Sequence, residues 1–274
     1  MKPSQGNTIL LITGAYFHDS IWKEWIDVFE NAGFSVVVPQ WPFKQLDAQL
    51  LRNRHPDCPG ASLTLEQLLH FYEREIAELP QRPVLVGHSL GGLIVQLLLQ
   101  RDLASGGIAL SSMPPRGIHG IRWFLHSLGL AKWFTTPRSS HMVSFAEWQY
   151  RIVNHMPMEQ QKNLFYSYSI PDSKRLVRDT LDCVAKVDFK KPHAPLLFMA
   201  GQRDRLTTTG IIYSNYKSYT CSNSVTEFRL FKGMNHIATG AAPGVEQAAY
   251  TIQWIARHCA GIRFLKISKS REAQ

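Results

Sequence analysis

A serine flanked by glycines stands where an apolar run changes into a helix-like run. Residues 87–91, Gly-His-Ser-Leu-Gly, follow the apolar residues 83–86 and precede the helix-like residues 93–99. A tight strand-to-helix turn strains its central residue, and glycine on both sides allows the close approach. We therefore predict that Ser89 exposes a nucleophilic hydroxyl, and that the Leu90 N–H receives negative charge from a substrate oxygen. A glycine-flanked serine also occurs in ordinary turns, so the prediction needs partner residues.

Two downstream residues have the types that would activate Ser89. A serine hydroxyl needs a base to take its proton, and the base needs a carboxylate that fixes its tautomer. Asp204 follows the apolar residues 195–200, and His236 follows residues 225–231. Because the carboxyl ends of parallel strands meet at one edge of a sheet, we expect these three side chains to converge there. Such a group of residues would attack a carbonyl carbon.

Other carboxylates are weaker candidates for the acid. The loop after the predicted strand that ends near Ser112 is a second place for it, but residues 112–115 contain no carboxylate. Asp188 and Asp172 are less suitably placed. Asp204 is preferred, although a solvated turn aspartate would look the same in the sequence.

Other histidines compete with His236 for the role of base. His193 precedes a predicted strand instead of following one, and His88 is expected to point into packed surroundings. His18 lies in the loop after the first predicted strand, where a substrate contact and a structural role are equally compatible with the sequence. Tyr16, His18 and His88 are kept as candidate substrate contacts.

The elements that would position these residues are short apolar runs that alternate with helical patterns. Continuous apolar runs favour a parallel sheet covered on both faces. Ser20 is predicted to cap a helix that ends at Gly33. Thr64 and Gln67 form a capping-box pattern for a second helix, which runs towards Leu79. The predicted strands are residues 8–12, 34–38, 84–86, 107–111, 195–200 and 225–231. The predicted fold class is α/β, with a mostly parallel, doubly wound sheet.

One long region interrupts this alternation. It contains no convincing strand, and helix starts are predicted at Ser144, at Pro157 and near Ser173. We interpret the region as an insert over the C-terminal edge of the sheet. The predicted division is a core of residues 1–115 and 186–274 and a helical cap of residues 116–185.

Part of this insert is apolar and basic. No Asp or Glu occurs from Leu103 to Ala146, and in residues 121–134 apolar side chains alternate with basic ones. This pattern is typical of a cap helix that packs on the core, which we favour, or of a helix at a lipid surface. Acidic or amphiphilic substrates would be favoured near it. A second basic cluster, in residues 263–271, is interpreted as a solvated tail.

The length and composition of the chain limit the classes of protein to which it can belong. The chain has 274 residues, 45% of them hydrophobic, which suits one elaborated globular domain. No apolar run is long enough for a membrane span or a signal peptide, so we expect a cytoplasmic protein. The net charge of +9 is spread along the chain without a recognition motif, so a nucleic-acid partner is not expected. The four cysteines lack metal-ligand or redox spacing and are expected to be reduced thiols.

With the serine turn, the Asp204 loop and the His236 loop in this order, the chain resembles the α/β-hydrolase superfamily, in particular bacterial serine hydrolases with a helical cap. The resemblance covers nearly the whole chain and implies an α/β-hydrolase fold. It implies that the oxyanion hole consists of the N–H groups of Leu90 and Ala15. Many relatives have His-Gly where this sequence has Thr13-Gly14, which leaves Tyr16 as a neighbouring candidate for the second donor.

The predicted function is cofactor-free hydrolysis of a carboxylic ester or related acyl compound through an acyl-enzyme, with no metal. The predicted partner is a small-molecule substrate. The alternatives are a lyase, a C–C hydrolase or a cofactor-free haloperoxidase on the same scaffold, or a ligand-binding protein without catalysis.

Overall fold

A parallel sheet forms the centre of the computed structural model, which describes residues 8–56, 58–118, 140–237 and 242–259. Within these residues the sheet has six strands in the order β2-β1-β3-β4-β7-β8, all parallel. The strands are β1 (Thr8–Ile12), β2 (Ser35–Val37), β3 (Val84–His88), β4 (Gly106–Leu110), β7 (Leu196–Gly201) and β8 (Thr226–Phe231). Every residue of β3, β4 and β7 is buried, as the continuous apolar runs predicted.

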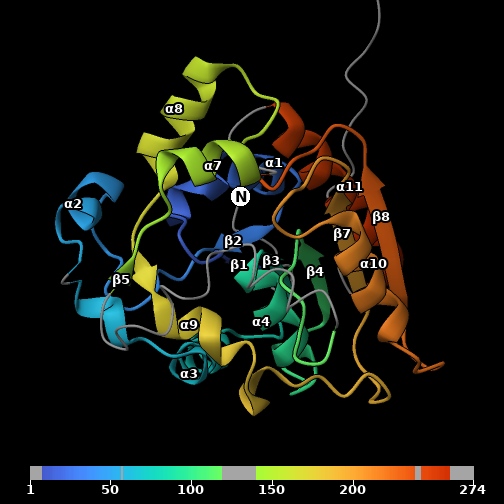
Figure 1. Ribbon diagram of the computed structural model, residues 1–274. Coiled ribbons are helices and arrows are strands. Elements are labelled where there is room, and N and C mark those ends of the chain that lie inside the picture. Colours follow the sequence, from blue (N-terminus) through green and yellow to red (C-terminus); the bar gives the residue numbers. More distant parts are fainter. Residues whose placement is uncertain (1–7, 57, 119–139, 238–241, 260–274) are drawn as a thin grey trace, which may run out of the picture.

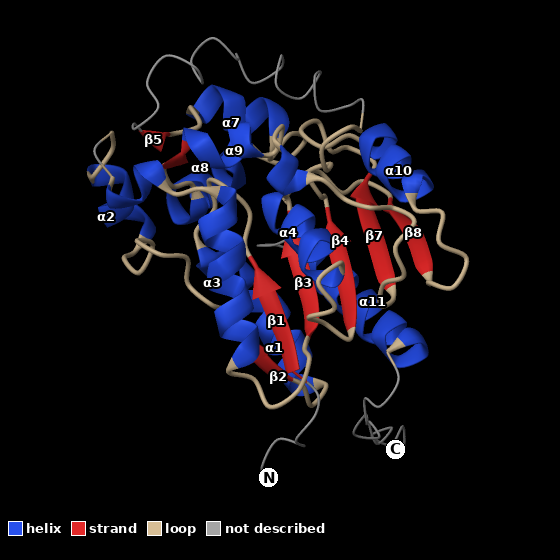
Figure 2. Cartoon of the chain, turned by 90° about the horizontal axis from the view of Figure 1, so that it is seen from below, coloured by secondary structure: helices blue, strands red, loops and turns tan. Residues whose placement is uncertain are grey.

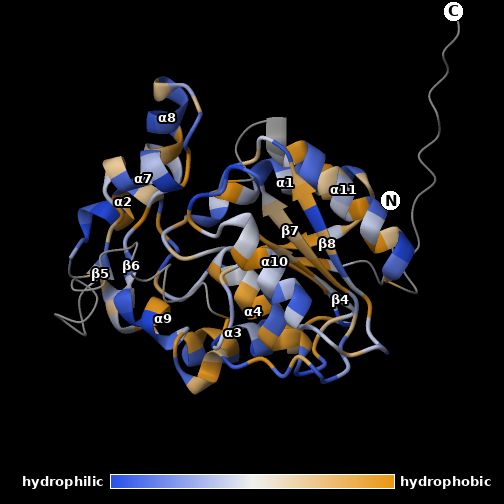
Figure 3. Ribbon diagram, turned by 45° about the vertical axis from the view of Figure 1, so that its right-hand side comes forward, coloured by the Kyte–Doolittle hydropathy of each residue, from blue (hydrophilic) through white to orange (hydrophobic). Residues whose placement is uncertain are grey.

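Helices cover both faces of this sheet (Figures 1 and 3). On one face α1 (Lys23–Asn31) packs against α11 (Ala242–His258). On the other face lie α3 (Leu65–Ala77), α4 (Leu90–Leu99) and α10 (Thr209–Ser218). All residues of α4 are buried, because α4 packs on β3 and β4 and is covered by α3. The predicted doubly wound α/β architecture is confirmed.

The helix termini test the predicted caps. The Thr64 side chain accepts from the Gln67 N–H, and the Gln67 side chain accepts from the Thr64 N–H, so the capping box before α3 is confirmed. Gly33 has a φ of 90°, which supports the predicted helix end there. The prediction that Ser20 caps the first helix is wrong. His18 is the N-cap of the 3-10 helix η1 (Asp19–Trp22), because its imidazole accepts the Ser20 N–H.

Between β4 and β7 the chain leaves the sheet. Residues 140–185 of this excursion are called the intervening segment. Its helices are α7 (Phe145–Arg151), α8 (Met158–Tyr168), α9 (Lys174–Asp179) and the 3-10 helix η3 (Cys183–Ala185). Their N-caps include Ser144, Pro157 and Ser173, as predicted. Figure 2 shows α7, α8 and α9 beyond the arrowheads of the strands, at the carboxyl edge of the sheet.

The expectation that this region lacks strands is wrong. β5 (Ser140–His141) and β6 (Asp172–Ser173) form an antiparallel pair. Two residues per strand are too few to give a periodic sequence pattern, which explains why the pair was not predicted. The intervening segment also contacts α2 (Ala48–Asn53) and the 3-10 helix η2 (Pro59–Ser62), which follow β2 in the chain.

Two predicted features lie outside the described residues: the apolar and basic stretch 121–134, and the basic cluster at 263–271. In the ranges that are described, no helix is long and apolar enough to cross a bilayer. The cytoplasmic location stays a prediction. All four cysteines are free thiols.

Candidate active site

Ser89 occupies the strained turn that its sequence context predicts. Its φ of 56° and ψ of −114° lie outside the ordinary regions for a side-chain-bearing residue. A Cβ on Gly87 would overlap the Gly91 carbonyl, and a Cβ on Gly91 would overlap the carbonyl oxygen of Ile12. Glycine is therefore required on both sides of the serine, because the start of α4 is pressed against β1 and β3.

The main chain of Ser89 is held by the neighbouring strand. Its N–H donates to the Leu110 carbonyl at 2.9 Å, and its carbonyl accepts from the Met113 N–H at 2.9 Å. Although Ser89 is the N-cap of α4, its side chain does not cap the helix. The hydroxyl makes no hydrogen bond within the described residues, so it is available to another group.

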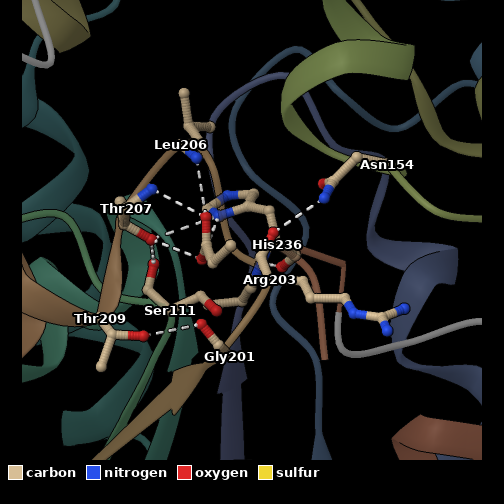
Figure 4. A network of polar contacts seen from close by, with 10 residues as sticks. Ser111, Asn154, Gly201, Arg203, Leu206, Thr207, Thr209 and His236 are labelled. Carbon is tan, nitrogen blue, oxygen red and sulfur yellow. Dashed lines mark hydrogen bonds and ion pairs between the residues drawn. The ribbon is translucent and has the colours of Figure 1, made fainter. Parts of the chain in front are cut away.

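Asp204 and His236 form a buried pair, as predicted. His236 Nδ1 lies 2.9 Å from Asp204 Oδ2, and both side chains are fully buried. The carboxylate also accepts the N–H groups of Leu206 at 2.8 Å and Thr207 at 2.9 Å (Figure 4). Because an ionised carboxylate only accepts, Nδ1 carries the proton in this pair, which leaves Nε2 as the acceptor. A histidine in this tautomer can take a proton from a hydroxyl.

Thr207 supports this pair and was not predicted. Its Oγ1 lies 2.9 Å from Asp204 Oδ2 and 2.8 Å from the Ser111 carbonyl, which ties the Asp204 loop to the end of β4. The signal in the sequence would have been a threonine three residues after an aspartate, the spacing of a side-chain-to-backbone turn.

His88 lies under the His236 loop. Its Nε2 donates to the His236 carbonyl at 2.9 Å, and the two ring centroids are 4.9 Å apart. Burial, and then the nearby charge of His236, lowers the pKa of His88 to about 3. His88 is therefore neutral with its proton on Nε2. It supports the His236 loop from within the core and is not among the residues that line the pocket described below.

The structure thus joins Asp204 to His236 directly but does not bond His236 to Ser89. In the part of the chain that is described, His236 Nε2 is buried without a hydrogen-bond partner. Ser89 is next to His88, which is bonded to the main chain of His236. All three predicted residues follow strands β3, β7 and β8 at the same edge of the sheet.

The loop after β1 runs beside the serine turn. A Cβ on Gly14 would come within 2.9 Å of Ser89 Cβ, so little space separates the two. Among the described residues the Ala15 N–H donates no hydrogen bond, whereas the Tyr16 N–H donates to Asp172 Oδ2 at 3.0 Å. The Leu90 N–H, the first in α4, has no acceptor within the helix. The amides of Leu90 and Ala15 therefore have no acceptor among the described residues, whereas that of Tyr16 is occupied.

An apolar pocket opens at Ser89. Its walls come from the core loops and from the intervening segment, and nearly all of its surface is apolar. It is lined by Ala15, Tyr16, Phe17, Ser89, Met113, Val143, Arg151, Ile152, Val177 and Leu206. Such a pocket suits the hydrocarbon part of a ligand.

The remaining candidates have other contacts. Both ring nitrogens of His18 are engaged, with Ser20 Oγ at 2.8 Å and the Leu46 carbonyl at 3.1 Å, and His18 is not among the pocket residues. His193 Nδ1 is bonded to the adjacent Ala194 carbonyl. Asp188 accepts a main-chain N–H from Lys190 in an exposed turn.

Asp172 pairs with a lysine instead of a histidine. Its Oδ2 lies 2.6 Å from Lys44 Nζ, in addition to the bond with Tyr16.

Two side-chain amides, those of Asn154 and Asn235, were also missed by the sequence analysis. Asn154 Nδ2 donates to the Arg203 carbonyl, and Asn235 Nδ2 donates to the Asn154 carbonyl, so the intervening segment is bonded to the Asp204 and His236 loops.

Comparison with solved structures identifies similar folds. A monoacylglycerol lipase from Paleococcus ferrophilus has a TM-score of 0.69 at 21% sequence identity, covering 93% of this chain and 95% of the lipase. A methylesterase from Arabidopsis has a TM-score of 0.63 at 16% identity, covering 92% and 99%. Methylketone synthase I from tomato, in complex with 2-tridecanone, has a TM-score of 0.67 at 14% identity, covering 92% and 98%. At these identities the likeness concerns the fold alone.

Comparison at the level of sequence gives the family. No curated protein matches the chain by sequence. A sequence model of the alpha/beta hydrolase family matches residues 9–248, a range that includes Ser89, Asp204 and His236. The match extends over most of the chain and agrees with the parallel sheet and its helices. The chain therefore belongs to the alpha/beta hydrolase family.

Proposed function

We propose that this protein is a serine hydrolase that cleaves a carboxylic ester through an acyl-enzyme. One observation carries the proposal. A strained serine with an unbonded hydroxyl lines an apolar pocket, at the sheet edge that also holds a buried carboxylate–imidazole pair. Neither a purely structural turn nor a simple binding pocket requires this combination.

The first half-reaction transfers the acyl group to Ser89. His236 Nε2 takes the Ser89 proton while the hydroxyl oxygen attacks the ester carbonyl carbon. The N–H groups of Leu90 and Ala15 stabilise the oxyanion, the first with the help of the N-terminal end of the α4 dipole. Asp204 orients His236 and stabilises its charged form. The imidazolium then returns its proton to the departing alkoxide, which leaves as an alcohol.

The second half-reaction restores the serine. His236 takes a proton from a water molecule, which attacks the acyl carbon and forms a second oxyanion. When this intermediate collapses, the proton passes to Ser89 Oγ, and a carboxylic acid is released. All protons are accounted for by the side chains of the chain and by water, so the proposal includes no metal or cofactor.

The pocket supports a substrate with an apolar acyl group. In this proposal residues 116–185 form the cap, because the described side chains of Val143, Arg151, Ile152 and Val177 close the pocket from that side. The natural substrate would be a small molecule, with its hydrocarbon part against these residues.

The test combines a fluorophosphonate probe with p-nitrophenyl esters of increasing chain length. Wild-type protein is expected to be labelled and to hydrolyse the esters. Ser89→Ala should lose the label and about 10⁴-fold or more in kcat. Ser222→Ala, which changes an exposed serine, is the matched control and should keep both. A folded wild-type protein that is neither labelled nor active would favour a ligand-binding role, and label without ester hydrolysis would favour another reaction at Ser89.

A further inference from the structure

The loop after β1 is bonded to the intervening segment by its main chain. The His18 N–H donates to the Tyr168 carbonyl at 2.8 Å, and the Ile170 N–H donates to the Tyr16 carbonyl at 3.1 Å. These bonds connect parts of the chain that are about 150 residues apart. The carbonyl side of Tyr16 is therefore fixed by the end of α8 and the residues that follow it.

The N–H side of Tyr16 is fixed by a carboxylate. Asp172 Oδ2 accepts the Tyr16 N–H at 3.0 Å and the Lys44 ammonium at 2.6 Å. Both side chains of the ion pair are nearly buried, at 3% and 11% exposure. Lys44 also lies 3.7 Å from the centroid of the Trp41 ring, a cation–π contact.

The backbone of Tyr16 needs this support. Its φ of 68° is unusual for a residue with a large side chain, and such a conformation persists only where the surroundings hold it. A carboxylate is a stronger acceptor for an N–H than a neutral oxygen. A buried carboxylate in turn requires a counter-ion, which Lys44 supplies. Burial lowers the pKa of Lys44, and the charge of Asp172 opposes this shift.

We propose that Asp172, with Lys44 as its counter-ion, is a positioning residue for the oxyanion hole. By holding the amide of Tyr16, it keeps the adjoining Ala15 N–H in one orientation beside Ser89. The inference rests on the proposed function, since it assigns a task in ester hydrolysis. It also explains why the donor is the Ala15 amide: the next amide along the chain is already bonded to the carboxylate.

A role in positioning has a different kinetic signature from a role in folding alone. The oxyanion exists in the transition state and not in the bound ester, so a misplaced donor lowers kcat and leaves KM nearly unchanged. Affinity for a trifluoromethyl ketone, which adds to the serine and forms an oxyanion, should fall in parallel with kcat. Loss of cap packing alone would instead change KM or thermal stability.

The experiment compares two double variants that both remove the buried charges. Asp172→Ala with Lys44→Met deletes the acceptor for the Tyr16 N–H, whereas Asp172→Asn with Lys44→Met keeps an amide oxygen there. We expect the first to lower kcat and trifluoromethyl ketone affinity by about 10- to 100-fold, and the second to stay within about fivefold of wild type. If the first double variant does not fold, Asp172→Leu with Lys44→Met, which also deletes the acceptor but fills the volume of the side chain, takes its place in the comparison.

Asp179→Ala is the matched control. Asp179 belongs to the same intervening segment, and its Oδ2 accepts the N–H of the core residue Leu65 at 2.9 Å, away from the pocket. This variant should lose stability but keep kcat. The inference is overturned if the acceptor-deleting variant, when folded, keeps kcat and inhibitor affinity, or if Asp179→Ala loses as much. Failure of the proposed function is separate, because then wild type would hydrolyse no ester or Ser89→Ala would remain active.

Discussion

The intervening segment meets the core loops at two places that are built differently. At the Tyr16 interface, residues 168–172 hold the loop after β1 through main-chain hydrogen bonds and the buried ion pair of Asp172 and Lys44. At the Asn154 interface, the side chains of Asn154 and Asn235 make the contacts described for the Asp204 and His236 loops. One interface adjoins Ala15, a candidate oxyanion donor, and the other adjoins Asp204 and His236, the candidate acid and base.

The difference shows which contacts hold the Asp204 loop and which hold the loop after β1. Asp204 is already held by its own loop, through Leu206 and Thr207, so the Asn154 interface adds little to the geometry of the carboxylate. In the loop after β1, by contrast, both the N–H and the carbonyl of Tyr16 are bonded to distant residues. We therefore expect activity to depend more on the Tyr16 interface than on the Asn154 interface.

The largest effect should come from changing Asp204, the carboxylate that its own loop holds in place. Asp204→Asn would keep the shape of the side chain but would disrupt the tautomer and the charge stabilisation of His236. We expect kcat/KM for a p-nitrophenyl ester to fall on the order of 10⁴-fold. Asp188→Asn, in an exposed turn, is the control and should be near wild type. A loss below tenfold for Asp204→Asn would remove Asp204 from the proposed mechanism.

A smaller effect is expected when one of the two hydrogen bonds of the Asn154 interface is removed. Asn154→Ala removes the donor to the Arg203 carbonyl and should lower the free energy of unfolding by about 1 to 2 kcal/mol. Its kcat should fall less than that of the variant without an acceptor at position 172. Urea unfolding and ester kinetics measure the two quantities, with the exposed Asn223→Ala as control. A larger loss of kcat from Asn154→Ala would reverse the ranking of the interfaces.

The smallest effect at neutral pH concerns His88, which supports the His236 loop from the core. Its folded pKa of about 3 is below the unfolded value of 6.5, so the unfolded chain binds more protons between these values. The free energy of unfolding should therefore fall as pH decreases through this window, by up to about 1.4 kcal/mol per pH unit from this residue.

His88→Gln keeps a donor for the His236 carbonyl and should make that pH dependence shallower. Urea unfolding at pH 4.5 and pH 7 measures the change, and Asn223→Ala, which changes an exposed side chain without removing a titratable group, should leave the slope as in wild type. Equal slopes in wild type and His88→Gln would show that His88 is not the group that is buried in its neutral form.

The parts that could be predicted from the sequence have local signals. The apolar runs identified the strands, and glycines at 87 and 91 marked the strained turn around Ser89. The position of Asp204 and His236 after strands predicted their pairing, which is confirmed at 2.9 Å. Whether these residues act as a catalytic triad with Ser89 stays a prediction.

The parts that were missed or wrong depend on contacts between distant residues. Asp172 is 156 positions from Tyr16 and 128 from Lys44, and no pattern in the sequence predicts either hydrogen bond. The incorrect cap at Ser20 has a local cause: a 3-10 helix already begins after His18, whose imidazole accepts the Ser20 N–H, so Ser20 lies inside that helix and not before it. Sequence patterns therefore identify the candidate reactive groups, whereas the contacts that hold these groups in place form between residues far apart in the sequence and cannot be predicted from local patterns.

The tight fit of the serine turn also limits how this protein can diversify. Because only a hydrogen atom fits at positions 87 and 91, substitutions there would disrupt the turn that holds Ser89. Positions 143, 152 and 177, which line the same pocket from a segment outside the sheet, already carry side chains. New substrate preferences would therefore arise by mutation in that segment, while the turn stays constant.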